Sequence, residues 1–279
     1  MPITELRRTI RVKAESAWLR DFAANVTSQS GEDGIIAKIF DTIGAVNCWC
    51  VEFGAWDGKY LSNTWNLRRN KGWRSVLIEG DPARATALAA ENQEQDSAAT
   101  VVQAHVGWAG KDVLDSILAG SGLPANFDLL SIDIDGNDWH VWRALKHYQP
   151  RLVVVEFNPS ASNDFYFVQD ADPAINQGAS LLAFCDLARE KGYELAATTA
   201  ANAFFVVTDE FPKLGIADNS PDAIHAPQST TELCQGFDGT IFAAGHMMLT
   251  WHGIPLDQED FQVLPRHLRK YPLSLEPES

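Results

Sequence analysis

Short apolar runs alternate with longer segments of helical periodicity along most of the chain. Buried strands are expected where apolar residues follow one another, at residues 45–53, 74–80, 99–106, 127–135 and 151–158. Helices are expected where apolar residues recur every three or four positions, at residues 28–44, 61–72, 82–95, 111–119, 138–148 and 179–192. Strands that alternate with helices predict a mostly parallel sheet with helices on both faces.

Two further strands, at residues 193–199 and 202–208, stand too close together for a crossover helix between them. They are therefore expected to form an antiparallel hairpin that closes the sheet. The predicted fold class is α/β, with seven strands of which one runs against the others.

The regions on either side of this alternation have a weaker pattern. Residues 1–27 are expected to form an N-terminal helical extension, with a helix of mixed polarity over 4–25, and residues 28–208 the main domain. Residues 209–279 contain prolines, aromatic residues and histidines without clear periodicity, and are expected to form a C-terminal lid or cap.

The composition is that of a folded protein with an acidic surface. The chain has 279 residues, 46% of them hydrophobic, and a formal net charge of −15, which makes nucleic acid an unfavourable partner. No stretch approaches the roughly 20 apolar residues of a membrane span, and residues 1–22 lack the apolar core of a signal peptide. Cys48, Cys50, Cys185 and Cys234 show no zinc-site or disulfide spacing, so a cytoplasmic protein with reduced thiols and no membrane partner is expected. A homo-oligomer is left open.

Glycines and polar residues gather where the predicted strands end. In an open α/β sheet, ligands bind at the carboxyl ends of the strands. The five parallel strand ends supply Glu52, Gly54, Trp56, Asp57 and Gly58, then Glu79, Gly80 and Asp81, then His105 and Gly107, then Asp133, Asp135, Gly136, Asn137 and Asp138, and finally Glu156 and Asn158.

The first two strand ends favour a nucleoside ligand. Gly54 lets a ligand approach the backbone closely, and Glu79 can accept both hydroxyls of a ribose. The alternative is that Gly54 and Gly58 are only turn residues and Glu79 an exposed cap. The turn is not GxGxxG, so a dehydrogenase is less favoured.

The acids after the fourth and fifth strands are candidates for a metal site. Asp133 and Asp135 point to one side of an extended chain, as do Glu156 and Asn158, and Asp138 follows close behind. Hard oxygen ligands of this kind suit Mg²⁺, Mn²⁺ or Ca²⁺ better than zinc. Alternatively, the loop is a tight turn with an N-cap at Asn137, or one acid binds the acceptor or the ammonium group of a cofactor.

Histidines near this loop are candidates for a catalytic base that needs no metal. His140 lies one turn into the following helix, and His246 and His252 lie in a segment that could fold over the site. Each histidine can equally be a surface or core residue. Trp108, Trp139, Trp142 and Trp251 are core residues or a pocket wall that would suit a sugar or an aromatic acceptor.

Six segments resemble the FkbM-type branch of the class I S-adenosylmethionine-dependent methyltransferases. They are SQSGEDGII, CVEFGAWDGKYLSNTWNL, VLIEGD, LLSIDIDGNDWHVWRAL, VVVEFN and GYELAATTAANAFFV, in the order of the family and within residues 28–208. The resemblance implies a Rossmann-like fold and a bound S-adenosylmethionine.

The resemblance also implies roles for single residues. The methionine moiety would lie near Glu52, Gly54, Ala55, Trp56, Asp57 and Gly58. Apart from the resemblance, Asp133 is a further candidate for binding the cofactor. The ribose would bind Glu79, next to Gly80, and the adenine would lie near His105 and Val106. The acid cluster is similar to that of catechol and sugar O-methyltransferases, in which a divalent ion holds the acceptor oxygens.

The expected function is therefore methyl transfer from S-adenosylmethionine to a hydroxyl of a small molecule such as a sugar or another natural product, with Asp133, His140 and His252 as candidate catalytic residues. Two alternatives keep the same fold. One is a metal-dependent enzyme with a redox metal such as iron, or a cyclase or lyase that uses the same cofactor. The other is a non-catalytic module that binds a partner.

Overall fold

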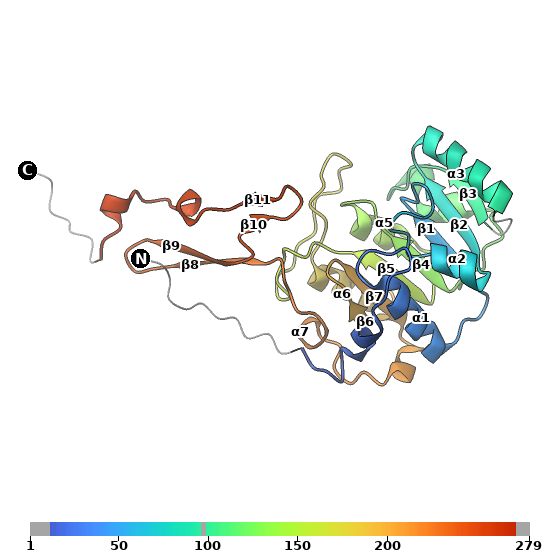
Figure 1. The fold of residues 1–279 in the computed structure, drawn as a ribbon, viewed down its shortest axis with the longest axis horizontal. Coiled ribbons are helices and arrows are strands. Elements are labelled where there is room, and N and C mark those ends of the chain that lie inside the picture. Colours follow the sequence, from blue (N-terminus) through green and yellow to red (C-terminus); the bar gives the residue numbers. More distant parts are fainter. Residues whose placement is uncertain (1–11, 96–98, 272–279) are drawn as a thin grey trace, which may run out of the picture.

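A computed structural model describes residues 12–95 and 99–271 of the chain. Seven strands form one sheet in the order β3-β2-β1-β4-β5-β7-β6 (Figure 1). Their bounds are β1 Trp49–Phe53, β2 Arg74–Glu79, β3 Ala99–Gln103, β4 Leu129–Ile132, β5 Leu152–Glu156, β6 Tyr193–Thr198 and β7 Asn202–Val207. Only β7 runs antiparallel to its neighbours, β5 and β6. The predicted seven-stranded sheet with a closing hairpin is therefore confirmed.

Helices connect the parallel strands, as the periodicity predicted. The α-helices are α1 Glu32–Ile43, α2 Trp65–Lys71, α3 Pro82–Gln95, α4 Leu114–Leu118, α5 Asp138–Ala144, α6 Leu181–Glu190 and α7 Pro221–Ile224. Strand order proceeds outward from β1 to β3 in one direction and from β4 to β5 in the other. Because crossovers between parallel strands are right-handed, the helices of the two halves cover opposite faces of the sheet.

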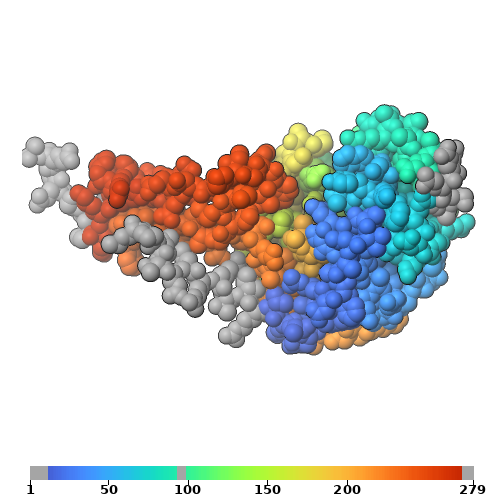
Figure 2. Space-filling model, viewed as in Figure 1, coloured from blue at the N-terminus to red at the C-terminus, as the bar shows by residue number. Residues whose placement is uncertain are grey.

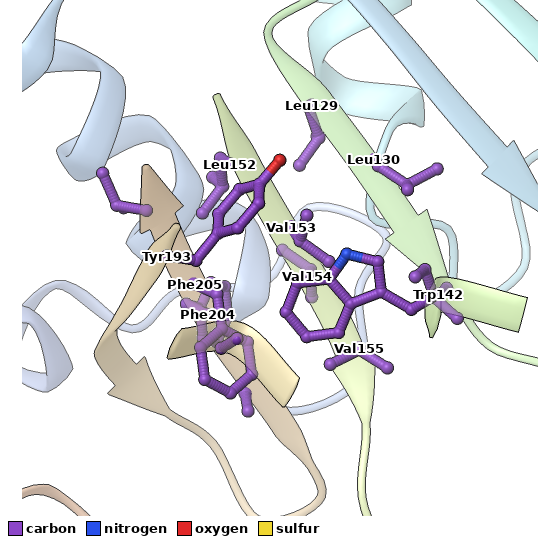
Figure 3. Close-up of a cluster of buried hydrophobic side chains, with 14 of the residues drawn as sticks. Leu129, Leu130, Trp142, Leu152, Val153, Val154, Val155, Tyr193, Phe204 and Phe205 are labelled. Carbon is purple, nitrogen blue, oxygen red and sulfur yellow. The ribbon is translucent and has the colours of Figure 1, made fainter. Parts of the chain in front are cut away.

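The core lies around the central strands, whose sequence is rich in β-branched residues. Leu152 to Val155 of β5 are completely buried (Figure 3), as expected for a strand covered on both faces. The Trp142 ring of α5 packs against Tyr193 and Phe205, with ring centroids 5.6 and 5.2 Å apart. The Tyr193 hydroxyl donates a hydrogen bond to the Pro150 carbonyl oxygen at 2.7 Å, so this buried polar group is satisfied.

A buried ion pair joins the amino ends of β4 and β5, at the end of the sheet opposite to the predicted site. The Asp128 carboxylate accepts hydrogen bonds from the backbone N–H groups of Val46, Asn47 and Cys48. It also lies 2.8 Å from the Arg151 guanidinium, which donates a further bond to the Gly44 carbonyl. Both charged side chains are almost fully enclosed, and Arg151 also lies 3.1 Å from the Glu210 carboxylate, so the charges of this pair are compensated within the protein.

The N-terminal segment differs from the prediction. The expected helix over 4–25 is wrong for residues 12–25, which form turns and the 3-10 helix η1 (Trp18–Phe22); residues 4–11 lie outside the described residues. Leu19 is fully buried in the main core, and the Trp18 indole N–H donates to the Leu214 carbonyl. This segment therefore packs on the body, because its few apolar side chains find partners there.

The region after β7 divides into two parts. Residues 209–226, with the 3-10 helix η3 (Phe211–Leu214) and α7, bury Leu214, Ile216 and Ile224 in the main core. Residues 227–271 form an arm that projects from the body (Figures 1 and 2). Its elements are β8 Thr231–Gln235, β9 Ile241–Gly245, β10 Met248–Leu249, β11 Ile254–Pro255, η4 Gln258–Phe261 and η5 Arg266–Leu268.

Two sequence-based expectations concern the cysteines and membrane-spanning helices. None of the four cysteines forms a disulfide. Among the helices of residues 12–95 and 99–271, none combines the length and apolar character needed to cross a membrane. The cytoplasmic location stays a prediction, and the oligomeric state stays open.

Candidate functional site

Three carboxylates meet beyond the ends of β4 and β5. Asp133, Asp135 and Glu156 each offer one oxygen atom, and these atoms lie within 4.8 Å of one another. The two strands are paired in register from Leu129 to Ile132, which places the loop after β4 beside the end of β5. This spacing and the hard oxygen donors suit a divalent cation such as Mg²⁺, Mn²⁺ or Ca²⁺.

The loop after β4 owes its shape to Asp138. Its buried carboxylate accepts hydrogen bonds from the backbone N–H groups of Ile134 and Gly136, both at 2.9 Å. Asp135 adopts a left-handed backbone with φ of 57°, which Asp tolerates better than most residues. Asp138 thus folds the loop so that the neighbouring acids project from it, and it is not one of the three clustered carboxylates.

The crowding of these acids changes their protonation. Burial, followed by the charges of Asp138 and Asp135, raises the pKa of Asp133 to about 7. Burial and the charge of Asp133 raise the pKa of Glu156 to about 9. Since nearby negative charges oppose ionisation, a bound cation would relieve this repulsion.

A cavity of about 550 Å³ lies against the acid cluster. One side carries Asp135, Glu156 and Asn158 from the sheet edge. The opposite side carries Met248, Leu249, Trp251, His252 and Leu256 from the β10–β11 hairpin. The cavity therefore combines a polar floor with an apolar and aromatic wall, the composition of a site for a small organic molecule.

Asn158 is held by the backbone around it. Its side-chain N–H donates to the Gln177 carbonyl at 2.8 Å, and its side-chain oxygen accepts from Ser160 N–H at 2.9 Å. The amide thus faces the cavity edge with both ends already bonded. Its role as a metal ligand stays a prediction.

Glu79 lies at the end of β2, where a nucleoside was expected. Its two carboxylate oxygens accept hydrogen bonds from Trp56 N–H at 2.8 Å and Asp81 N–H at 2.9 Å. A carboxylate has about four acceptor positions, so two remain for the hydroxyls of a ribose. The bond to Trp56 also ties the turn after β1 to the end of β2.

Two glycines at these strand ends make close contacts, and Gly54 is required because its contact is with the backbone. A Cβ atom on Gly54 would lie 2.5 Å from the carbonyl oxygen of Asp133, and its φ is 71°. A Cβ atom on Gly80 would lie 2.5 Å from Nδ1 of His105, whose ring therefore rests against this glycine. These contacts bring His105 beside the end of β2 and the acidic loop beside the end of β1.

The other residues of the turn after β1 are held by the protein itself. Ala55 is buried with Leu77 and Leu88, and a Cβ atom on Gly58 would collide with Leu88. The Asp57 carboxylate accepts from the N–H groups of residues 59 and 60, as in an ordinary turn. The contacts of Ala55, Asp57 and Gly58 within the protein explain the shape of the turn. Cofactor contacts at these three residues stay a prediction.

Trp56 and Val106 border this region. Trp56 is 48% exposed, adopts a positive φ of 47° and carries the Arg84 guanidinium over its ring at 4.7 Å. Val106 is half-buried against the main core. An exposed, strained tryptophan next to Glu79 indicates a surface that a ligand could cover.

Glu52 has a structural task that the sequence did not reveal. Its buried carboxylate accepts hydrogen bonds from the Ser62 hydroxyl at 2.6 Å, Asn63 N–H at 2.8 Å and the Thr64 hydroxyl at 2.7 Å. These bonds order the segment before α2 and use most of its acceptor capacity. A direct role for Glu52 in binding methionine stays a prediction.

Of the three candidate histidines, His246 does not line the cavity, and His140 and His252 lie in different places. His252 lines the cavity beside the acid cluster, whereas His140 is not among the residues that line it. The His140 Nε2 atom lies 2.8 Å from the Gln169 carbonyl oxygen; since that oxygen can only accept, Nε2 carries a proton and Nδ1 is the basic atom. His252 is thus the better placed of the two to meet an acceptor.

Sequence reasoning missed Gln169, which organises the loop opposite the acids. Its side-chain oxygen accepts from the N–H groups of Gln177 and Gly178, and its side-chain N–H donates to Ile175. A Cβ atom on Gly136 would lie 3.0 Å from the Gln169 side chain and the Ile175 carbonyl. No motif marks this glutamine, since its partners are all backbone groups.

Asn137 is the N-cap residue of α5, as expected for a tight turn, but its side chain makes no capping bond. It donates a hydrogen bond to the Asp172 carbonyl oxygen instead.

The strand order with its reversed β7 is that of the class I S-adenosylmethionine-dependent methyltransferase fold. No family model matches the chain, and no curated protein matches it. Among solved structures, an S-adenosylmethionine-dependent methyltransferase from Clostridium acetobutylicum is 9% identical, with a TM-score of 0.42 over 63% of this chain and 90% of that one. A counterpart from Aquifex aeolicus is 9% identical, with a TM-score of 0.40 over 62% and 89%. The glycopeptide N-methyltransferase MtfA, complexed with S-adenosylmethionine, is 12% identical, with a TM-score of 0.36 over 61% and 85%.

Proposed function

We propose that the protein is an S-adenosylmethionine-dependent O-methyltransferase of the FkbM type, acting on a hydroxyl of a sugar or another natural product. The observation that carries the proposal is the joint position of Glu79 and the acid cluster at one edge of a class I methyltransferase sheet. Ligands of open α/β sheets bind at this edge. The motifs that resemble FkbM-type enzymes support the same conclusion.

The residues present fit S-adenosylmethionine. Glu79 retains acceptor positions for the two ribose hydroxyls, and His105 lies against Gly80, where the adenine would pack. Gly54 would let the methionine moiety approach the backbone between β1 and β4. When bound, the cofactor supplies an electrophilic methyl group on a positively charged sulfur.

The acid cluster fits a divalent cation. Asp133, Asp135 and Glu156 would bind it, with Asn158 at the edge of the same cavity. Such an ion lowers the pKa of a hydroxyl that it binds and fixes its orientation. In the absence of the ion, His252 is the residue of the cavity that would take the hydroxyl proton.

The contribution of the chain itself is positioning. The acids hold the hydroxylated end of the acceptor, and Met248, Leu249 and Trp251 cover its apolar part and exclude water. Holding a nucleophile and an electrophile in a reactive arrangement supplies much of the rate enhancement of such a transfer. In this account the β10–β11 hairpin acts as the lid that the sequence led us to expect.

Glu79→Ala is expected to weaken binding of S-adenosylhomocysteine about 5- to 150-fold, because charged hydrogen bonds to the ribose, together worth about 1–3 kcal/mol, are lost. Isothermal titration calorimetry measures the effect. Glu79→Gln, which keeps an acceptor oxygen, should lose less. Glu91→Ala removes an exposed acid from α3 and should bind as the wild type does.

The same titrations can overturn the proposal. Equal affinity of Glu79→Ala and the wild type would mean that the nucleoside lies elsewhere. A wild-type protein that does not bind the cofactor product would favour a non-catalytic module on this fold. Iron in protein purified without chelators would favour redox chemistry over methyl transfer to oxygen.

A further inference from the structure

A second cavity, of about 220 Å³, lies at the same edge of the sheet as the acid cluster. Thr198 at the end of β6 and Thr199 in the turn to β7 line it, together with Ser30 and Arg20 from the N-terminal region. Since β7 is antiparallel to both neighbours, β6 runs in the same direction as β5 and ends at the same edge. Ser229 lines this cavity and also the larger one beside the acids, so the two share a wall.

Arg20 gives this cavity a positive charge in a protein of net charge −15. Its guanidinium makes no hydrogen bond or salt bridge to any residue within 12–95 and 99–271. It is also the one Lys or Arg among the described residues that line the cavity. A half-buried guanidinium with five donors is well suited to a carboxylate or a phosphate.

His225 is a second, independent observation that points to a ligand in this cavity. It lines the cavity and is only 4% exposed. Its Nδ1 atom lies 3.0 Å from the Thr198 hydroxyl oxygen, while its Nε2 atom is buried and has no hydrogen-bond partner among the described residues. An unsatisfied buried polar atom costs about 1–3 kcal/mol and calls for an explanation.

The state of this histidine fits an anionic ligand. Burial and the charge of Arg20 lower the pKa of His225 to about 4, so the ring is neutral near pH 7. If the Thr198 hydroxyl donates to Nδ1, the ring proton lies on Nε2, which becomes a donor without an acceptor. An anion bound to Arg20 could accept this hydrogen bond.

We propose that this cavity binds an anionic group, a carboxylate or a phosphate, between the Arg20 guanidinium and the His225 Nε2–H. The group belongs to the acceptor, whose hydroxyl end lies in the adjoining cavity beside the acids. This assignment rests on the proposed function, and it narrows the substrate to hydroxylated molecules that carry a carboxylate or a phosphate. The acid cluster on one side and Arg20 on the other would then fix the direction in which the acceptor lies.

Titration of the full chain with inorganic phosphate, and separately with acetate, tests the site without cofactor or methyl transfer. At constant ionic strength, both are expected to raise the melting temperature in a saturable manner. Arg20→Gln should weaken this binding at least about 10-fold, as for the loss of one charged contact worth about 1.4 kcal/mol, and Arg20→Lys should lose less. Lys111→Gln, which removes an exposed cation, is the matched control.

The outcomes distinguish an anionic group of the acceptor from a free anion. They also distinguish failure of this inference from failure of the proposed function. With methyl acceptors, Arg20→Gln should raise KM for acidic compounds and leave KM for their neutral analogues unchanged. Arg20→Gln could instead change KM equally for acidic acceptors and for their neutral analogues, while the wild type still binds phosphate. A free anion would then bind here, which overturns the assignment to the acceptor. Binding of neither anion by the wild type, or equal binding by Arg20→Gln, would overturn the site itself. Cofactor binding by the wild type is read independently in each case.

Discussion

Asp133→Asn is expected to weaken binding of Mn²⁺ or Mg²⁺ at least about 100-fold and to abolish cation-dependent methyl transfer. Loss of groups that only support metal ligands already costs 10- to 100-fold in affinity, and Asp133 would be a direct ligand. Calorimetric titration with Mn²⁺ measures the effect. The variant should fold normally, since it removes a charge that its acidic neighbours oppose, and Asp41→Asn on the exposed side of α1 is the control.

The same cluster predicts how the site responds to pH. The pKa of Asp133 is raised to about 7 and that of Glu156 to about 9, so a cation must displace protons and should bind more tightly from about pH 6 to about pH 8. Between their ordinary and raised pKa values these acids hold more protons in the folded than in the unfolded state. The stability of the cation-free protein should therefore fall as the pH rises through this range. An affinity that does not depend on pH, or tight Mn²⁺ binding by Asp133→Asn, would remove the cluster from the metal site.

Asp128→Ala is expected to lower the free energy of unfolding by about 3–5 kcal/mol, the usual cost of removing one partner from a buried ion pair. The substitution leaves the enclosed Arg151 without this partner and deprives the N–H groups of Val46, Asn47 and Cys48 of their acceptor. Urea denaturation followed by circular dichroism gives the value.

An exposed pair provides the comparison for Asp128→Ala. Asp186 lies 2.8 Å from Arg189 on the surface of α6, and Asp186→Ala should cost less than about 1 kcal/mol. If Asp128→Ala lowers the free energy of unfolding by no more than Asp186→Ala does, the Asp128–Arg151 ion pair does not stabilise this end of the sheet. The remaining contact of Arg151 with Glu210, at 3.1 Å, would then be sufficient for it.

The sheet could be predicted from the sequence because each parallel strand is a short, largely apolar segment bounded by turn residues. The short connection between residues 198 and 202 forced the closing hairpin, since no helix fits there. The N-terminal segment could not be predicted in the same way. Leu19 is buried in the main core and the Trp18 indole N–H donates to Leu214, so the segment depends on partners that are distant in the sequence.

The site shows the same division. Parallel strands bring their carboxyl ends together, so the meeting of Asp133, Asp135 and Glu156 follows from topology. The hydrogen bonds of Glu52 and Asp138 did not follow, because they depend on how the loops at residues 62–64 and 134–136 fold. The sequence pattern of an acid at a strand end is the same whether its side chain faces a ligand or a backbone N–H group.

A crystal structure of the protein with S-adenosylhomocysteine and Mn²⁺ would show where the nucleoside and the cation bind. We expect ribose hydroxyls within hydrogen-bonding distance of Glu79, and an anomalous Mn²⁺ peak bound by Asp133, Asp135 and Glu156. A nucleoside bound away from the ends of β1 and β2, or a Mn²⁺ peak away from these acids in crystals that contain the ion, would contradict this expectation.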